Sequence, residues 1–529
     1  MARTWDAIVI GGGHNGLVCA AYLAKAGRKV LVLEKRPLVG GAAVSEELHP
    51  GFTYSVCSYV VSLLRPWIIR ELDLARHGLE ILPLDCTFNP FPDGRSLARW
   101  GDAARTRREV AQFSARDAEM LPQFGRQMVE ISRFVKPIID APAADPLSRN
   151  PADLFGAAAF GRRFVGLGPD MLARKIKMLT MSAVDFLHEW FECEQLIAPM
   201  AGSGIIGTFL GIRSPGTAYV LLHHYMGEID GHFRSWGLAR GGTGAISNAI
   251  AGAARAAGAE IRTGAGVAEL RMHGGEVQGV VLESGEELHA RAVVSALDPH
   301  RTFFGLAGRE NLPDEFAADL GRYKLRGSSG KVNLALDALP DFVSRPGAGP
   351  HLMGDITIAP TIDSVERAYD QAKYGEFSHE PFLNIVIPSL TDPSVAPPGK
   401  HVMSCFVQYA PYHLAAGAGT WPLRREEFGD AVVDTIARYA PGIKDLILHR
   451  QVLTPWDLEK DFGLTEGNIF HGELSLEQLA FLRPVPGWAR YKTPLPRLWM
   501  CGSGTHPGGG IMGAPGALAA RAMLREGRA

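Results

Sequence analysis

The chain has 529 residues, more than the roughly 250–300 that a single hydrophobic core accommodates, so we expect two intertwined domains. Hydrophobic residues make up 46% of the chain and charged residues 21%, which is typical of a globular protein. The formal net charge of −2 excludes a strongly basic surface, and we expect no nucleic-acid partner.

The sequence lacks motifs for metals, redox dithiols and membrane spans. The six cysteines form no C-x-x-C pair and no H-E-x-x-H motif occurs, so we predict no metal site. Scattered single cysteines fit a reducing compartment. No signal peptide and no run of about 20 apolar residues is visible. We therefore expect a cytoplasmic protein, either free or peripheral at the inner membrane surface.

The first strong pattern lies near the amino terminus. It predicts, in order, a buried strand, a helix and a second strand over residues 7–10, 15–26 and 29–33. Gly11, Gly13 and Gly16 form G-x-G-x-x-G between the first strand and the helix. Glycines in this position, between a strand and a helix, predict a dinucleotide-binding unit.

Each of these glycines has a physical role. Gly11 permits the tight turn, Gly13 leaves room for a pyrophosphate beside the backbone, and Gly16 lets the helix pack closely on the strand. The helix N-terminus then directs N–H groups at the phosphates. Glu34, at the end of the second strand, is placed to accept hydrogen bonds from an adenosine ribose and to repel the 2′-phosphate of NADP.

The middle of the chain alternates between helical and strand patterns. Residues 136–152 contain four prolines and predict a loop, whereas residues 171–200 predict one helix. Residues 245–257 predict a further helix, which follows a glycine-rich turn. Short strands are predicted over residues 260–263, 277–283 and 292–295.

Residues 331–409 predict a different kind of sheet. Its strands favour a mixed or antiparallel substrate-domain sheet and are predicted over residues 331–336, 355–359, 382–388 and 402–409. The carboxyl terminus returns to the first pattern, with a strand over 497–501, a glycine-rich loop to Gly510 and a helix over 514–525.

These elements define an α/β fold class. We predict a discontinuous dinucleotide-binding Rossmann domain of the glutathione-reductase type, together with a mixed α+β substrate domain. The dinucleotide-binding domain is assigned to residues 1–75, 236–300 and 485–529. The substrate domain is assigned to residues 76–235 and 301–484.

Six segments spread along the chain carry a family resemblance. They are DAIVIGGGHNG at 6–16, VLEKRPLVGGAA at 32–43, GFTYSVCSYVVSLL at 51–64, HHYMGEIDGHFRSWGLARGG at 223–242, EGNIFHGEL at 466–474 and CGSGTHPGGGIMG at 501–513. Together they resemble the phytoene-desaturase-like FAD oxidoreductases, most of all the branch called pyridine nucleotide-disulfide oxidoreductase domain-containing protein 2. The resemblance covers nearly the whole chain, although the paired cysteines that the branch name suggests are absent.

The resemblance implies FAD as the cofactor. In this family the first glycine motif and Glu34 hold the ADP half, Gly40 and Gly41 lie near the phosphates and flavin, and Val267 touches adenine through its backbone. The terminal motif brings a helix N-terminus to the flavin, where the helix dipole stabilises negative charge on the reduced ring. The implied FAD-binding residues are Gly11, Gly13, His14, Asn15, Gly16, Glu34, Lys35, Gly40, Gly41, Ala42, Val267, Gly502, Gly510, Ile511 and Met512.

Three positions depart from the family pattern. Gly12 stands in place of the usual alanine, Thr243 in place of methionine and Glu466 in place of glycine. The first leaves the glycine motif intact. The other two are expected to affect the flavin pocket and the choice of substrate rather than the fold.

Residues 223–232 supply candidate catalytic groups. The polar members are His223, His224, Tyr225, Glu228, Asp230 and His232. In a strand, His224 and Glu228 share one face, which would line the flavin cavity, and we take both as candidates. The alternative is that they are structural or surface polar residues. His506, which by resemblance lies near the flavin ring, either acts as a base or orients its loop.

We therefore expect an FAD-dependent oxidoreductase of the phytoene-desaturase-like kind. It would dehydrogenate, saturate or isomerise an apolar, isoprenoid-like or lipid substrate and pass electrons to oxygen, a quinone or another acceptor. One alternative is a binding or assembly factor with structural FAD and a protein partner or a second copy of itself, and another is an amine oxidase. The apolar and basic residues 155–178 form either a lipid-docking surface or a solvated helix pair, the second being favoured.

Overall fold

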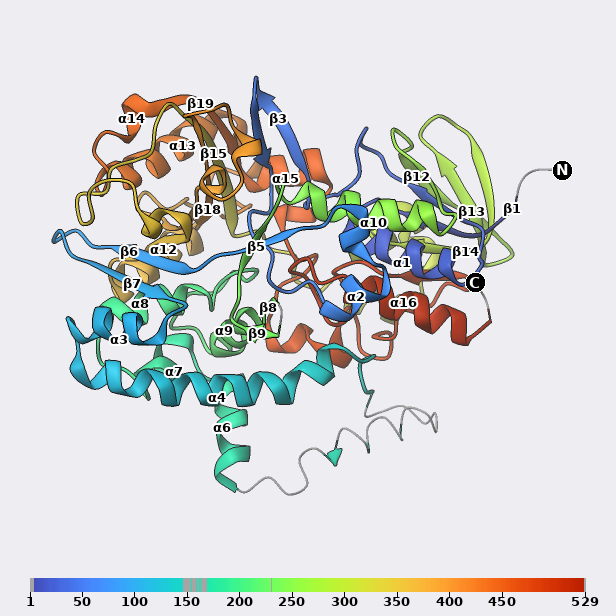
Figure 1. The fold of residues 1–529 in the computed structure, drawn as a ribbon. Coiled ribbons are helices and arrows are strands. Elements are labelled where there is room, and N and C mark those ends of the chain that lie inside the picture. The colour runs from blue at the N-terminus through green and yellow to red at the C-terminus, as the bar shows by residue number, and fades with distance from the viewer. Residues whose placement is uncertain are drawn as a thin grey trace.

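The computed structural model describes residues 4–145, 154, 158, 161–162, 169–229 and 231–527. In this part of the chain two seven-stranded sheets stand side by side, each with helices packed against it (Figure 1). One sheet, with its helices, forms the dinucleotide unit, and the other forms the substrate unit. The candidate site lies where the two units meet.

The dinucleotide sheet collects strands from the beginning, the middle and the end of the chain. Its neighbours run in the order β11-β2-β1-β14-β13-β12, and β20 pairs with the carboxyl half of β14. Five strands are parallel: β1 (Thr4–Ile10), β2 (Val30–Leu33), β11 (Glu260–Arg262), β14 (Glu287–Ser295) and β20 (Leu498–Met500). An antiparallel hairpin of β12 (Val267–His273) and β13 (Glu276–Leu282) completes it. The strands predicted for this sheet are thereby confirmed.

Strand β1 is apolar throughout its second half because both faces of the sheet are covered. Ala7 and Val9 pack on the side of α1 (His14–Lys25), whereas Ile8 and Ile10 pack on the opposite side with Phe316 of α11 (Asp314–Leu320). Helices α10 (Gly244–Ala256) and α16 (Ala514–Arg525) lie against α1 (Figure 1). Their alanine-rich faces permit this close approach.

The substrate sheet is mixed. Its strands run in the order β19 (Ile447–Leu453), β15 (Ser329–Leu336), β18 (His401–Gln408), β17 (Phe382–Val386), β16 (Asp355–Ile358), β6 (Cys86–Pro90) and β7 (Ser96–Trp100). Only β16 and β6 pair in parallel. The four predicted strands between residues 331 and 409 are confirmed. Strands β6, β7 and β19 were not predicted, because they lie outside that segment and carry polar residues.

One helix prediction in the substrate unit is wrong, and one loop prediction has the wrong start. The single helix over 171–200 is three helices, α6 (Pro169–Thr180), α7 (Ala183–His188) and α8 (Glu194–Gly202). Ser182 starts α7 anew, because its side chain accepts a hydrogen bond from the backbone N–H of Asp185. The loop predicted from residue 136 begins later, since α4 (Ala115–Ile139) continues through Pro137. The segment 155–178 lies partly outside the described residues.

The remaining elements connect and cover the two sheets. Helices α3 (Ala103–Ala111), α12 (Ile362–Lys373), α13 (Trp421–Ala437), α14 (Ile443–Leu446) and α15 (Pro455–Phe462) belong to the substrate unit. The other elements are α2 (Pro66–Glu71), α9 (Thr217–Tyr225) and the short strand pairs β3 (Ser45–His49) with β4 (Phe52–Ser55), β5 (Ile81–Pro83) with β10 (Gly237–Ala239), and β8 (Glu228–Ile229) with β9 (His232–Phe233).

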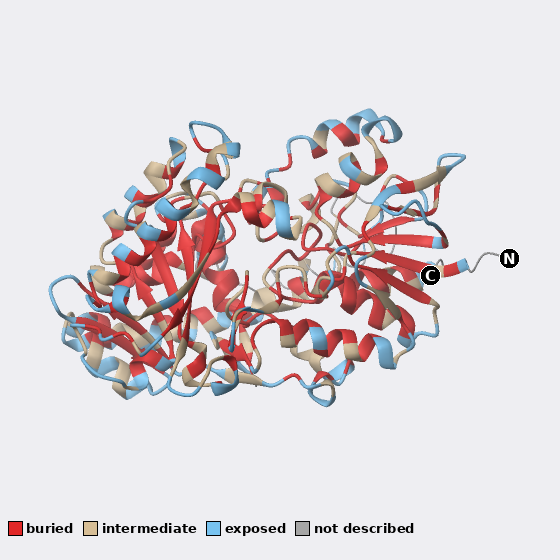
Figure 2. Ribbon diagram, turned by 90° about the horizontal axis from the view of Figure 1, so that it is seen from above, coloured by how far each residue is buried: buried red, intermediate tan, exposed pale blue. Residues whose placement is uncertain are grey.

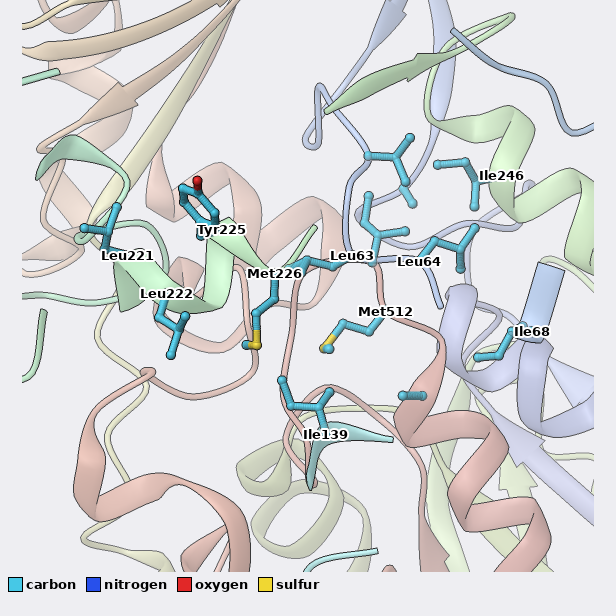
Figure 3. Close-up of a cluster of buried hydrophobic side chains, with 14 of the residues drawn as sticks. Leu63, Leu64, Ile68, Ile139, Leu221, Leu222, Tyr225, Met226, Ile246 and Met512 are labelled. Carbon is cyan, nitrogen blue, oxygen red and sulfur yellow. The ribbon is translucent and has the colours of Figure 1, made fainter. Parts of the chain in front are cut away.

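Buried residues concentrate in the two sheets and continue across the region between them (Figure 2). Figure 3 shows side chains of α9 there, facing residues that precede α2 and α16. The labelled residues of this cluster are Leu63, Leu64, Ile68, Ile139, Leu221, Leu222, Tyr225, Met226, Ile246 and Met512. This apolar contact fixes α9, and with it His223 and His224, against the dinucleotide unit.

Candidate active site

A cavity of about 410 Å³ opens at the carboxyl ends of β1 and β2. This dinucleotide cavity is where a Rossmann unit holds its cofactor. Most of the residues implied by the family resemblance line it: Gly11, Gly13, His14, Asn15, Gly16, Glu34, Lys35, Gly40, Gly41, Ala42 and Val267.

The turn from β1 into α1 depends on close backbone contact. Gly11 has a φ of +96°, and a Cβ at Gly16 would lie 2.2 Å from the carbonyl oxygen of Gly11. A side chain at position 16 would therefore push α1 away from the strand. The backbone N–H of Gly40 donates to the carbonyl of Gly12 at 2.9 Å, which joins the second glycine pair to the same turn.

Gly13 has no packing reason to be a glycine. A Cβ there would meet only the carbonyl oxygen of Gly40, at 4.0 Å, although Gly13 lines the cavity. Its φ of −69° is open to any residue. The space that a side chain would fill lies in front of the α1 N-terminus, where a pyrophosphate is expected to lie.

Glu34 is held at the end of β2 by two backbone donors. Its Oε2 accepts from the N–H of Gly12 at 2.7 Å, and its Oε1 accepts from the N–H of Arg36 at 2.9 Å. Each carboxylate oxygen keeps further accepting capacity, and the residue lines the dinucleotide cavity. Ribose hydroxyls can therefore donate to Glu34 without displacing either backbone bond.

Several buried polar atoms at this cavity lack a protein partner among the described residues. They include His14 Nε2, Asn15 Oδ1 and His471 Nδ1. Buried donors and acceptors are nearly always satisfied, so unpaired ones clustered at a cavity indicate a polar ligand. Together with the open space at Gly13, these atoms fit the phosphates and ribityl chain of FAD.

A second cavity, of about 110 Å³, adjoins the first and shares His14, Ala42, Ile469 and Ser503 with it. We call it the aromatic chamber because Tyr59, His224, Trp236, Phe406 and Phe470 form much of its wall. Gly510 and Ile511, just before α16, also line it. The terminal motif thus reaches both cavities, with Ser503 at their shared wall and Gly510 and Ile511 at the aromatic chamber.

The prediction that His224 lies in a strand is wrong, because His223 and His224 belong to α9. The His224 ring lies between Trp236 and Phe470, with centroids 6.1 Å away in each case and interplanar angles of 18° and 19°. Its Nδ1 lies 2.9 Å from the carbonyl oxygen of Val220. Burial lowers the pKa of His224 to about 4, so the ring is neutral at pH 7.

The aromatic chamber carries no formal charge at neutral pH among its described residues. Its titratable side chains are His14, Cys57, Tyr59 and His224. Burial lowers the pKa of His14 to about 4, raises that of Cys57 to about 12 and raises that of Tyr59 well above its ordinary value. The chamber is thus suited to an uncharged group.

The other two catalytic candidates lie away from these cavities. Glu228 begins β8 and forms an ion pair with Lys136, so its carboxylate is engaged structurally. His506 is buried, and its Nε2 lies 3.1 and 3.0 Å from the carbonyl oxygens of Ile138 and Ala141. This geometry corresponds to the loop-orienting alternative. Asp230 lies outside the described residues.

Gly502 and Met512, both implied to bind FAD, pack behind residues that line the cavities. A Cβ at Gly502 would lie 2.5 Å from the carbonyl oxygen of Ala296, and the carbonyl of Met512 accepts from the N–H of Arg65. Neither residue lines a cavity. The same is true of the departures Thr243, which is buried beside Val44, and Glu466, which pairs with His413. The expectation that these two affect the flavin pocket stays a prediction.

Sequence analysis missed Lys331 of β15. It is 2% exposed, and its Nζ donates to the carbonyl of Ser55 at 2.8 Å. Burial lowers the pKa of Lys331 to about 7, and the ammonium lies 5.7 Å from the ring of Tyr59. Lys331 therefore lies behind the wall of the aromatic chamber. The available signal was one lysine within the otherwise uncharged strand SGKVNLAL.

A family profile described as flavin containing amine oxidoreductase matches residues 16–524. The chain belongs to this family. It is 40% identical to pyridine nucleotide-disulfide oxidoreductase domain-containing protein 2 of Rattus norvegicus, across 99% of this chain and 94% of the relative. It is 26% identical to phytoene desaturase (lycopene-forming) of Pseudescherichia vulneris, across 98% of both. An oxidoreductase from Methanosarcina mazei shares the fold, with a TM-score of 0.62 at 19% identity over 98% of this chain and 99% of that one.

Membership of the flavin-containing amine oxidoreductase family makes FAD the cofactor and the protein an FAD-dependent oxidoreductase. The dinucleotide cavity fits the ADP half because of Glu34, Gly13 and the unpaired polar atoms. The adjoining aromatic chamber is the space left for the flavin ring and a reacting group.

Gly13→Leu is expected to abolish FAD retention while leaving the apoprotein folded. The leucine fills ligand space and meets no protein atom closer than 4.0 Å at its Cβ. We expect FAD affinity to fall by at least about tenfold, that is by 1.4 kcal/mol or more. The ratio of flavin to protein absorbance after desalting measures it. Gly125→Leu, at an open position in α4, is the control; equal flavin content in both variants would contradict the assignment.

Buried neutral histidines are expected to make this flavoenzyme less stable in acid. The pKa of His224 is about 4 in the folded chain and about 6.5 when unfolded, so the unfolded chain binds more protons between these values. Its contribution to stability therefore falls by about 2 kcal/mol from pH 7 to pH 5.

His224→Gln keeps an N–H donor for the Val220 carbonyl and should flatten this part of the pH dependence. Urea unfolding at pH 7 and pH 5 measures the difference. His188→Gln, at the exposed end of α7, is the matched control and should leave the dependence as in the unaltered chain. If the unfolding free energy changed equally between pH 7 and pH 5 in all three proteins, His224 would not be buried as a neutral ring.

Proposed function

We propose that this flavoenzyme oxidises or reduces carbon–carbon bonds of an apolar, isoprenoid-like group held in the aromatic chamber. The uncharged, ring-lined wall beside the cofactor cavity carries the proposal. An apolar group gains by leaving water for such a wall, whereas an ammonium loses its hydration there without a carboxylate to compensate. The phytoene desaturase that resembles this chain is named for such a reaction.

The chain's own residues bind and orient in this proposal. Bound FAD supplies a two-electron acceptor or donor, so dehydrogenation removes two hydrogens from the substrate and saturation adds two. Two ring pairs contact the apolar group and exclude water. They are the stacked rings of Tyr59 and Phe406, whose centroids lie 5.6 Å apart, and those of Trp236 and His224. The neutral His224 keeps its proton, held toward the Val220 carbonyl.

Two rival functions make different demands on the site. A purely structural FAD needs no space beside the flavin, but the aromatic chamber provides such space. An amine oxidase would have to admit its amine in the neutral form, since the described lining of the aromatic chamber holds no carboxylate. Anaerobic mixing of phytoene, squalene or putrescine with the oxidised and with the dithionite-reduced holoenzyme discriminates. A compound that is dehydrogenated bleaches the oxidised flavin, and one that is saturated restores the colour of the reduced flavin.

Val60→Trp is expected to slow reduction by the substrate without disturbing the cofactor. Val60 lines the aromatic chamber and a further chamber beyond it, so a bulkier ring closes the passage between them. We expect flavin bleaching by the reactive hydrocarbon to slow at least about tenfold, or 1.4 kcal/mol in the barrier. Reduction by dithionite should be unchanged. Val343→Trp, at an exposed loop position, is the control. Equal slowing in both variants would exclude this route.

We also propose that α6 docks on an anionic lipid surface, from which an apolar substrate would be drawn. Leu172, Ile176 and Leu179 recur on one face of α6 and are 39%, 52% and 41% exposed. Arg174 and Lys177 lie on the same helix and match anionic headgroups, although Lys177 also pairs with Glu189. No helix in the described residues is long and apolar enough to cross a membrane, so any contact would be peripheral.

Ile176→Asp is expected to weaken vesicle binding by about tenfold, since it removes one apolar side chain from the lipid contact. Co-sedimentation with phosphatidylglycerol-containing vesicles measures it. Leu423→Asp is the matched control, because Leu423 is 87% exposed on α13 and away from this face. Binding that is equal in all proteins, or absent in the unaltered chain, would refute the docking proposal.

A further inference from the structure

A third cavity, of about 530 Å³, continues from the aromatic chamber. It shares Tyr59, Val60, Ile206 and Trp236 with that chamber and, among the described residues, none with the dinucleotide cavity. It therefore lies beyond the aromatic chamber as seen from the cofactor. We call it the polar chamber, because charged and amide side chains line it.

Its polar wall is one face of the substrate sheet. Thr87 of β6 pairs in register with Arg99 of β7 on one side and with Asp355 of β16 on the other. Cross-strand partners point to the same face, so these three side chains form a polar row. Their neighbours along the strands point to the other face and pack in the core of the unit: Phe88, Ala98 and Ile356. The row is thus built into the strand register.

Arg99 in this row is a buried cation without a partner among the described residues. It is 9% exposed, it lines the polar chamber, and its Nε contacts no acceptor. Asp355 raises the pKa of Arg99 through its charge but makes no hydrogen bond to it, since its oxygens accept from Thr357 Oγ1 at 2.8 Å and Asn384 Nδ2 at 3.2 Å. A buried charge without a partner is costly, which indicates that an anion completes the site.

The other charges around the polar chamber also favour an anion at Arg99. Burial lowers the pKa of Arg99, and the charge of Arg234, which lines the chamber from an exposed position, lowers it further. Asp85 is exposed at the rim, and burial raises the pKa of Asp355 to about 6. His232 is likewise exposed. Only Arg99 is both buried and without a hydrogen bond in this group.

We propose that Arg99 binds a carboxylate at one end of the substrate, whose apolar part passes Tyr59 and Ile206 into the aromatic chamber. The inference rests on the proposed function, because it places one molecule in both chambers. The substrate class becomes an amphipathic organic acid, such as a fatty or isoprenoid acid. A carboxylate matches the planar guanidinium of Arg99 with two parallel hydrogen bonds and brings one negative charge to it.

The test titrates the FAD-loaded full chain with dodecanoate and with dodecanol, following the visible flavin spectrum and the melting temperature. We expect dodecanoate to bind at least about tenfold more tightly, because a charge-assisted hydrogen bond in a buried site is stronger than a neutral one. Dodecyl phosphate is the third probe. If it binds more tightly than dodecanoate and depends on Arg99, the carboxylate class is overturned.

Arg99→Gln separates ligand binding from a structural role. We expect dodecanoate affinity to fall about tenfold or more while dodecanol affinity stays within about twofold. The unliganded variant should melt no lower than the unaltered chain, because an unpaired buried charge has been removed. Arg95→Gln is the matched control, since Arg95 is exposed in the turn that joins β6 to β7 and pairs with Asp93.

Failure of this inference and failure of the proposed function look different. Equal binding of dodecanoate and dodecanol, or an unchanged preference in Arg99→Gln, overturns the carboxylate site even if hydrocarbons bleach the flavin. A flavin that no apolar compound or its acid reduces or reoxidises, while dodecanoate binding still depends on Arg99, overturns the proposed function and leaves the anion site standing. A lower melting temperature in unliganded Arg99→Gln, with unchanged ligand preference, would make Arg99 a structural residue.

Discussion

The site depends first on how closely α1 approaches β1. A Cβ at Gly16 would overlap the carbonyl of Gly11, so this contact exists only with glycine. Helix α16 approaches α1 in the same way, because a Cβ at Gly516 would lie 2.1 Å from the carbonyl of Asn15. The two helix N-termini are thereby brought together beneath one cavity wall. The first lies at the phosphate end, and the loop before the second reaches the aromatic chamber through Gly510. These two backbone contacts thus set the spacing of both halves of the FAD site.

In the substrate sheet, the strand register decides which side chains face the dinucleotide unit. Lys331, Phe406 and Asn384 are paired across β15, β18 and β17, so they share the face that meets the dinucleotide unit. The opposite face is apolar and forms the core of the substrate unit. A slip of one residue in any of these strands would exchange the two faces. The stability of this unit and the chemistry of its chamber wall are therefore fixed by the same pairing.

The sequence predicts the dinucleotide unit well because its signal is local. Glycines, an apolar strand and an acid within 34 residues fix the turn, the helix and the ribose position together. The aromatic chamber is different, because Tyr59, Phe406 and Phe470 meet from three distant segments. Two of these lie inside the segments that carry the resemblance, yet nothing in their spacing reveals a shared cavity. Arg99 is harder still, since a lone arginine in SLARW gives no sign that it will be buried without a partner. The misplacement of His224 has a similar cause, because HHYMGE alone does not show that its first residues continue the helix in which Leu221 and Leu222 pack into the core.

The distribution of charge along the cavities favours a substrate that binds in one orientation. Polar atoms without protein partners lie at the dinucleotide cavity, neutral rings line the aromatic chamber, and Arg99 stands in the polar chamber beyond. An uncharged ligand would be free to enter such a channel in either direction. A ligand with one anionic end is oriented, because its charge is stabilised beside Arg99 and is excluded from the apolar wall near the flavin. Binding energy gained far from the flavin would then position the reacting carbons without placing a charge beside them.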